Sequence, residues 1–146
     1  MRPRAWDEGI STGISTVDAE HRLQVTLVNA LEQVLRQGTD RALADRTVAQ
    51  LVDFSTVHFH SEELMMRLYA YPQLDAHALE HGRLLDQVAE IRRRVEAATF
   101  ADALAQIDAL RVWLTTHVRT MDHGFALWCA RHGIRPDPEG GPQGRI

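Results

Sequence analysis

Histidine is the residue type best able to do chemistry in this chain, because eight of the 146 residues are histidine. Imidazole is the commonest metal ligand among side chains. His58 and Glu62 are four residues apart, and His77 and His81 have the same spacing. On an α-helix this spacing puts both side chains on one face, one turn apart. Paired donors on one face are what a metal ion held between helices needs.

Two more histidines lie within apolar stripes, and one carboxylate follows the second of them. His21 shares a stripe with Val25, and His117 ends a similar stripe further along the chain. Asp122 follows His117 by five residues, which on a regular helix turns it about 140° away from alignment. A π-bulge or a helix end near Met121 would bring the carboxylate back towards the histidine.

Taken singly, these side chains have ordinary explanations, such as a core histidine with a hydrogen-bond partner or a surface pair one turn apart. Taken together, they send ionisable groups from separate stretches of chain to one place. Burying them without a partner would cost roughly several kcal/mol in aggregate. We therefore predict a metal site. Imidazole with carboxylate suits iron, zinc or copper, but the donors exceed the needs of one tetrahedral zinc ion.

The apolar periodicity predicts the helices that must position these donors. Apolar side chains recur at three- and four-residue steps over residues 17–37, 40–69, 73–97 and 100–121, with a short helical segment reaching residue 131. We expect Asp18 to cap the first helix and Thr99 the fourth. Gly38 should end the first helix, and Pro72 should separate the second from the third.

Helices joined by short links favour an all-α, up-down-up-down four-helix bundle, with an N-terminal arm, a short C-terminal helical segment and a tail. We expect one domain over residues 1–133. The Gly- and Pro-rich residues 134–146 should form a flexible tail.

The composition limits the partners, the disulfides and the cellular location that we expect for the protein. The formal net charge is −4, so we expect no nucleic-acid partner. The one cysteine, Cys129, cannot form an internal disulfide. We find neither a signal segment nor a stretch long and apolar enough to span a membrane, and we expect a cytoplasmic protein.

The sequence resembles the hemerythrins, in particular the single-domain bacterial members. The similarity runs from Trp6 to Asp122 and fills all the ligand positions of that family with the expected residue types. The matching residues are Trp6, Val17-Asp18-Ala19-Glu20-His21 with Leu23, His58-Phe59-His60-Ser61-Glu62-Glu63 with Met66, Tyr71-Pro72, His77, His81, Trp113-Leu114-Thr115-Thr116-His117 and Asp122.

The resemblance implies a non-haem centre of two iron ions (Fe2+/Fe3+) with a bridging oxo or hydroxo group. One iron would take His77, His81 and His117. The second would take His21 and His58, which leaves it one open position for dioxygen. Glu62 and Asp122 would bridge the two ions. His60, His123 and His132 are assigned to the surface, and the helix face favours Glu62 over its neighbour Glu63.

The resemblance also implies a dry oxygen pocket beside the open position. Its lining would be Phe59, Met66, Trp113, Leu114 and Val118, with Leu114 gating the second iron. Ordinary core packing is the alternative explanation for all of these side chains.

The function implied is reversible binding of dioxygen for carriage, storage or delivery, with an unidentified oxygen-accepting protein as a possible partner. The protein would then not be an enzyme. The alternatives are an oxygen or redox sensor, and a di-iron enzyme acting on peroxide or nitric oxide.

Overall fold

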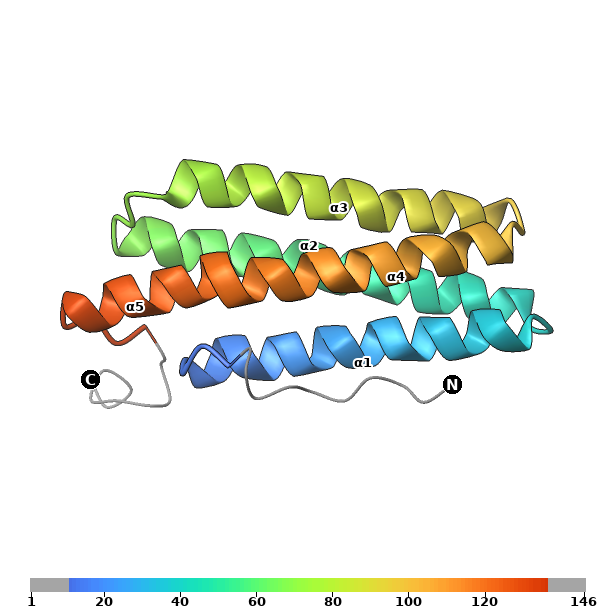
Figure 1. Cartoon of the computed structure of the whole chain (residues 1–146), viewed down its shortest axis with the longest axis horizontal. Helices are drawn as coiled ribbons and strands as arrows, with labels where there is room; N and C mark the ends of the chain where they lie inside the picture. The colour runs from blue at the N-terminus through green and yellow to red at the C-terminus, as the bar shows by residue number, and fades with distance from the viewer. Residues whose placement is uncertain (1–10, 137–146) are drawn as a thin grey trace.

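The computed structural model describes residues 11–136, and the regular structure of this range is helical throughout. The elements in chain order are α1 (Ser15–Gln37), α2 (Arg41–Leu68), α3 (Leu74–Glu96), α4 (Phe100–His117), the π-helix η2 (Val118–Asp122) and α5 (His123–Arg131). Helices α1 to α4 lie side by side, and α5 extends the bundle beyond the end of α4 (Figure 1).

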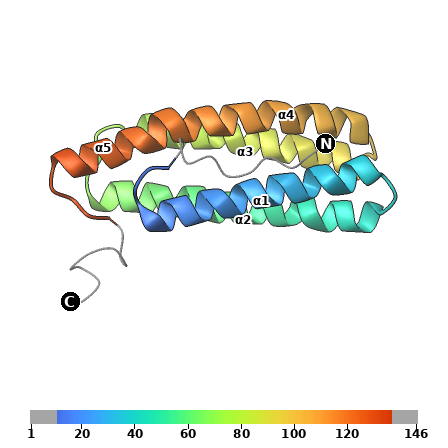
Figure 2. The same cartoon turned by 60° about the horizontal axis from the view of Figure 1, so that its bottom comes forward.

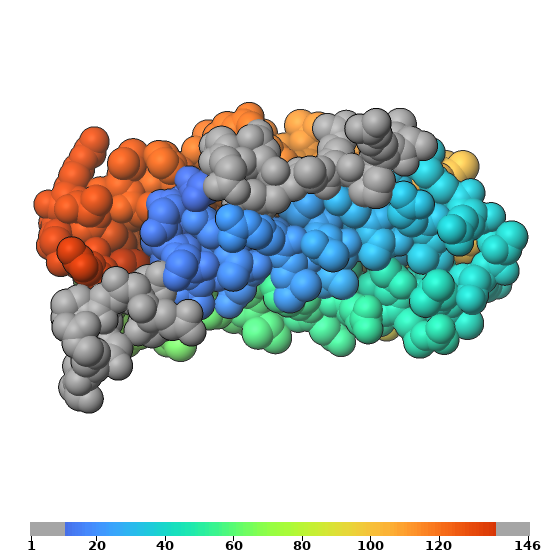
Figure 3. Space-filling model, turned by 90° about the horizontal axis from the view of Figure 1, so that it is seen from below, coloured from blue at the N-terminus to red at the C-terminus, as the bar shows by residue number. Residues whose placement is uncertain are grey.

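Successive helices run in opposite directions and pack as neighbours, which confirms the predicted up-down-up-down bundle. α2 packs against α1 and α3, and α4 packs against α3 and α1. Figure 2 shows α1 beside α2 on one side of the bundle and α3 beside α4 on the other. The face seen in Figure 3 is formed largely by α1, with α2 along one edge. Leu31, Ile91 and Ile107 are fully buried between the helices.

The helix ends confirm two of the sequence predictions and correct two others. Gly38 ends α1 in the left-handed conformation with φ 69°, and Pro72 lies between α2 and α3. Asp18, however, does not cap α1, because the helix begins a turn earlier, after Ile14. Thr99 occupies the N-cap position of α4 without capping it. Its hydroxyl instead donates to the carbonyl of Arg94, 3.0 Å away.

Asp18 instead anchors the segment that leads into α1. Its carboxylate accepts hydrogen bonds from the Thr12 N–H and hydroxyl, both at 2.8 Å, the Ser11 hydroxyl at 2.7 Å and the Gly13 N–H at 3.1 Å. Burial raises the pKa of this carboxyl, but the hydrogen bonds outweigh burial and hold the pKa below its usual 3.8. The sequence prediction located the residue correctly but gave its side chain the wrong partner.

Replacing Asp18 by asparagine should destabilise the fold by about 1–3 kcal/mol at neutral pH, because an amide can accept only part of this set of bonds. A carboxyl whose pKa is lowered by folding stabilises the folded chain above its unfolded pKa and loses that contribution as the pH falls through its folded pKa. Urea unfolding between about pH 2 and pH 7 should therefore show the two proteins converging in acid. Parallel stability curves across this range would contradict the assignment.

The turn before Asp122 is a π-helix, which is one of the two alternatives that the spacing from His117 left open. Val118–Asp122 adopts i to i+5 geometry between the regular helices α4 and α5. The wider turn returns Asp122 to the face of His117, and Asp122 Oδ1 lies 3.2 Å from His117 Nε2.

Part of the predicted terminal structure lies outside residues 11–136, namely Trp6, most of the N-terminal arm and residues 137–146 of the tail. Ile134, which the prediction placed in the tail, packs against the cluster that contains Phe125 and Cys129. Within the described range, no helix combines the length and apolar character needed to cross a membrane.

Candidate metal centre

The bundle brings together all the side chains that the sequence predicted as metal ligands. Each is at most 4% exposed. α1 contributes His21, α2 contributes His58 and Glu62, α3 contributes His77 and His81, α4 contributes His117 and η2 contributes Asp122. The i, i+4 pairs on α2 and α3 place two donors on the inner face of each helix, as their spacing indicated.

The donors form two groups that share Glu62. In the larger group, donor atoms of Glu62, His77, His81, His117 and Asp122 all lie within 4.8 Å of one another. In the smaller group, His21, His58 and Glu62 meet the same limit. The molecule therefore has a three-histidine side and a two-histidine side.

Glu62 and Asp122 each have one carboxylate oxygen facing the three-histidine side and one facing the two-histidine side. Glu62 Oε1 lies 3.1 Å from His81 Nε2, and Glu62 Oε2 lies 3.2 Å from the Nε2 atoms of both His21 and His58. Asp122 Oδ1 lies 2.8 Å from His77 Nε2, and its Oδ2 lies 3.0 Å from His21 Nε2. This is the arrangement that two bridging carboxylates require.

The hydrogen bonds outside the cluster leave lone pairs facing its interior. His58 Nδ1 lies 2.6 Å from Glu20 Oε1, and His81 Nδ1 lies 2.7 Å from Glu63 Oε2. A carboxylate only accepts, so each Nδ1 donates, and in the neutral ring each Nε2 then carries a lone pair directed inward. Such outer carboxylates commonly orient histidines that bind metals.

Several buried atoms of the cluster lack a hydrogen-bond partner anywhere in residues 11–136. They include His58 Nε2, His77 Nε2, His117 Nδ1, Glu62 Oε1 and both carboxylate oxygens of Asp122. In addition, His81 Nε2 and His117 Nε2 face each other at 3.2 Å. Converging lone pairs are costly in a buried site unless cations or protons lie between them. The donor set therefore fits metal ions.

The two carboxylates of the cluster favour protonated histidines when metal is absent. Burial lowers the histidine pKa values, but Glu62 and Asp122 outweigh burial and raise the pKa of His21 and His77 to about 9. The same carboxylates, with Glu20, raise the pKa of His58 to about 10. Without metal, the raised pKa values keep protons on His21, His58 and His77, and these protons must leave when cations bind.

Glu20 and Glu63 hydrogen-bond to two of the candidate ligands, and the ligand prediction did not assign them. Each immediately precedes or follows a predicted ligand in the sequence, and each lies on the outer side of a histidine ring. Adjacency to His21 and Glu62 was the available signal, but it could not reveal the cross-helix partners His58 and His81. His60, His123 and His132 are exposed, as expected.

The predicted pocket residues have different surroundings in the bundle. Leu114 and Val118 line a cavity that also contacts His21. Phe59 instead stacks on His81, with ring centroids 4.2 Å apart. Met66 packs in the apolar cluster near Phe125, at the other end of the site. Trp113 packs against the bundle core, and its indole N–H donates to Glu80.

Comparison with known proteins agrees with this geometry. Residues 12–129 match the family model of the hemerythrin HHE cation-binding domain. A bacteriohemerythrin of Pseudomonas paraeruginosa is 30% identical, with 97% of this chain and 93% of that protein covered. Myohemerythrin-1 of Phascolopsis gouldii is 26% identical, with 84% and 92% covered.

A solved structure shares the fold. The crystal structure of a wild-type hemerythrin superposes with a TM-score of 0.75 at 22% identity, covering 86% of this chain and 96% of that one. The family match and the coverage of the bacterial relatives lead to one conclusion: the chain belongs to the hemerythrin family, whose domain binds cations.

Proposed function

We propose that the cluster binds two iron ions and that the protein binds dioxygen reversibly. His77, His81 and His117 would hold one iron, and His21 and His58 the other. Glu62 and Asp122 would bridge them, together with an oxo or hydroxo group. The observation that carries this proposal is the position of the two carboxylates, each with one oxygen towards each histidine group.

The unequal donor sets support binding of a small ligand on the His21 side. The larger group has three imidazoles and the smaller has two, so an ion on the smaller side would have a position left for an exogenous molecule. The cavity lined by Leu114 and Val118 also contacts His21. Ligand access and the incomplete donor set therefore occur on the same side of the centre.

A bound iron pair supplies reversible electron exchange with dioxygen. The chain itself orients two of the imidazoles, those of His58 and His81, through Glu20 and Glu63. Apolar groups such as Phe59, Leu114 and Val118 are buried around the donors. Di-iron sites that activate oxygen are typically rich in glutamate. The histidine-rich set here has fewer anionic donors to stabilise high-valent iron, which favours carriage over oxygen cleavage. We also propose that the protein binds dioxygen in the cytoplasm.

Metal content and an optical spectrum test the function directly. We expect two irons per chain and a coloured form in air that bleaches under vacuum and returns on re-aeration over many cycles. Rapid, irreversible oxidation with consumption of peroxide at many turnovers would instead favour the enzyme alternative. Uptake of a single ion per chain would contradict the two-metal assignment.

A further inference from the structure

The candidate metal ligands are buried, so cations must enter the site through an opening of the bundle. Each of these side chains is at most 4% exposed. Moving a bare ion past an apolar wall is costly, because the ion loses its water without a replacement. An entry route for metal should therefore contain polar atoms, hold water and reach one of the ligands.

The cavity beside His21 does not meet these requirements. Its volume is about 20 Å³, which is room for about one water molecule. Its walls include Val28, Leu114 and Val118. A small neutral molecule fits this cavity, but a cation passing through it would meet mostly apolar carbon atoms.

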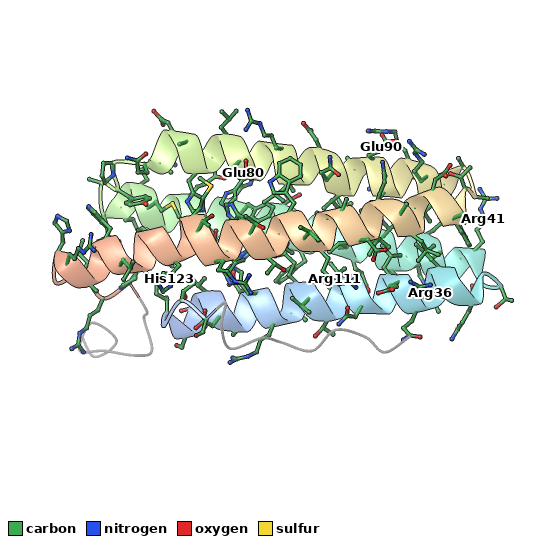
Figure 4. The ribbon with its side chains drawn as sticks, in the orientation of Figure 1. Arg36, Arg41, Glu80, Glu90, Arg111 and His123 are labelled. Atoms are coloured by element: carbon green, nitrogen blue, oxygen red, sulfur yellow. The ribbon has the colours of Figure 1, made fainter. Side chains whose placement is uncertain are left out.

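A larger cavity lies on the three-histidine side, beside His77. Its volume is about 230 Å³, it opens to solvent, and its lining includes Tyr71, Gln73 and Thr120. Polar atoms form a clearly larger share of this lining than of the wall beside His21. The start of α3 lies on one side of the cavity, and η2 with the start of α5 lies on the other, at the same end of the bundle (Figure 4). Water and oxygen atoms in such a cavity can surround a cation.

His77 belongs both to the wall of this cavity and to the metal site. Its Nε2 is buried and lies 2.8 Å from Asp122 Oδ1, so the ring separates the cavity from the other donors. The rings of His58 and His81 are each held at Nδ1 by a glutamate. His77 has no such outer carboxylate within residues 11–136. Its ring can therefore turn towards the cavity without breaking a bond of this kind.

We propose that this cavity is the route by which metal ions enter and leave the site. A hydrated cation first enters the cavity, and the His77 ring turns outward to bind it. The ring then returns towards Asp122 as the cation loses its remaining water. Because imidazole and carboxylate replace the water in steps, no bare ion has to cross an apolar wall. This inference rests on the proposed function only for the identity of the ions.

Filling the cavity should slow metal exchange without changing what the site binds. Gly124 lines the cavity, and an added Cβ there would lie 3.8 Å from the Tyr71 hydroxyl, an ordinary contact distance. The longer side chain of Gly124→Leu should occupy the cavity. We expect the metal-free, full-length chain to take up ferrous ion under argon, and to release iron to a chelator, about tenfold more slowly in this variant. Two irons per chain should still bind at the end.

Two further variants separate filling of the cavity from a general effect of leucine. Ala76→Leu fills the cavity from α3 and should slow both rates as well. Gly82→Leu is the matched control, because Gly82 is an exposed helical glycine beside the ligand His81, and an added Cβ meets nothing within 4 Å. It should exchange iron at the wild-type rates. Wild-type rates in both cavity variants, or equal slowing in Gly82→Leu, would overturn the inference.

The entry route and the proposed function fail in different ways. Azide binding to the ferric protein reports on the cavity beside His21, so Gly124→Leu should leave the azide association rate unchanged. If filled and unfilled chains load iron equally fast, the entry route is wrong, although reversible dioxygen binding still stands. If the wild-type chain takes up no iron, the proposed function fails, and the same exchange rates are measured with Co²⁺, which imidazole and carboxylate also bind.

Discussion

His77→Ala should abolish the coloured, oxygenated form and lower the iron content of the purified protein. His77 Nε2 is buried and lies 2.8 Å from Asp122 Oδ1. Removing it deletes one of three imidazoles on the larger side and the partner of Asp122 Oδ1. Loss of a metal ligand typically costs far more than the 10–100-fold seen on losing its outer partner. Iron per chain and the spectrum in air measure the effect.

The chain supplies its own control for this variant. His60 is exposed on α2, the same helix that carries His58 and Glu62. His60→Ala removes the same side chain without touching the centre, so it should keep two irons and the wild-type spectrum. If His77→Ala also kept two irons and unchanged bands, the ligand assignment would have to be abandoned.

The donors were predictable from the sequence because local spacing determines which helix face a side chain occupies. The pairs His58–Glu62 and His77–His81 are set by a single helical turn, and each lies inward as that turn requires. The position of Asp122 was harder to predict, because the helix face that it occupies depends on a π-helix. The five-residue spacing after His117 indicated either a π-bulge or a helix end, and the structure shows the π-helix.

Features that depend on how two helices meet could not be read from the sequence. The hydrogen bonds from His58 to Glu20 and from His81 to Glu63 cross between helices. Which side chains line the cavity beside His21 likewise depends on how α1 is rotated against α4. Apolar periodicity records that a residue faces inward, but not which inward residues share a cavity.

Asp18 illustrates a different limit. An aspartate at the start of an apolar run is a good capping candidate on statistical grounds. In the structure, Thr12 donates hydrogen bonds to the Asp18 carboxylate, so this side chain does not cap the helix. Helix α1 begins a turn earlier, at Ser15. Helix propensity could not predict the partners of Asp18, because the groups that donate to it lie in residues 11–13, a segment without helical periodicity.

Removing the metal should lower the melting temperature by on the order of 10 °C while leaving the helices largely in place. A cation that binds only the folded chain stabilises it by about 4 kcal/mol when its concentration is a thousand times its dissociation constant. Each kcal/mol shifts the midpoint by about 2–4 °C for a domain of roughly this size. Thermal unfolding followed by circular dichroism, before and after chelation, measures the shift.

The helices should survive chelation because much of the core is independent of the centre. Leu31, Leu51 and Ile91 are almost fully buried in an apolar cluster that contains none of the donors. Within the site, protons on the histidines offset part of the lost cation charge, given the raised pKa values of His21, His58 and His77. Adding iron back should restore the midpoint, and His77→Ala should show a much smaller response to chelator. An identical midpoint with and without metal would mean that the buried donors are satisfied without a cation.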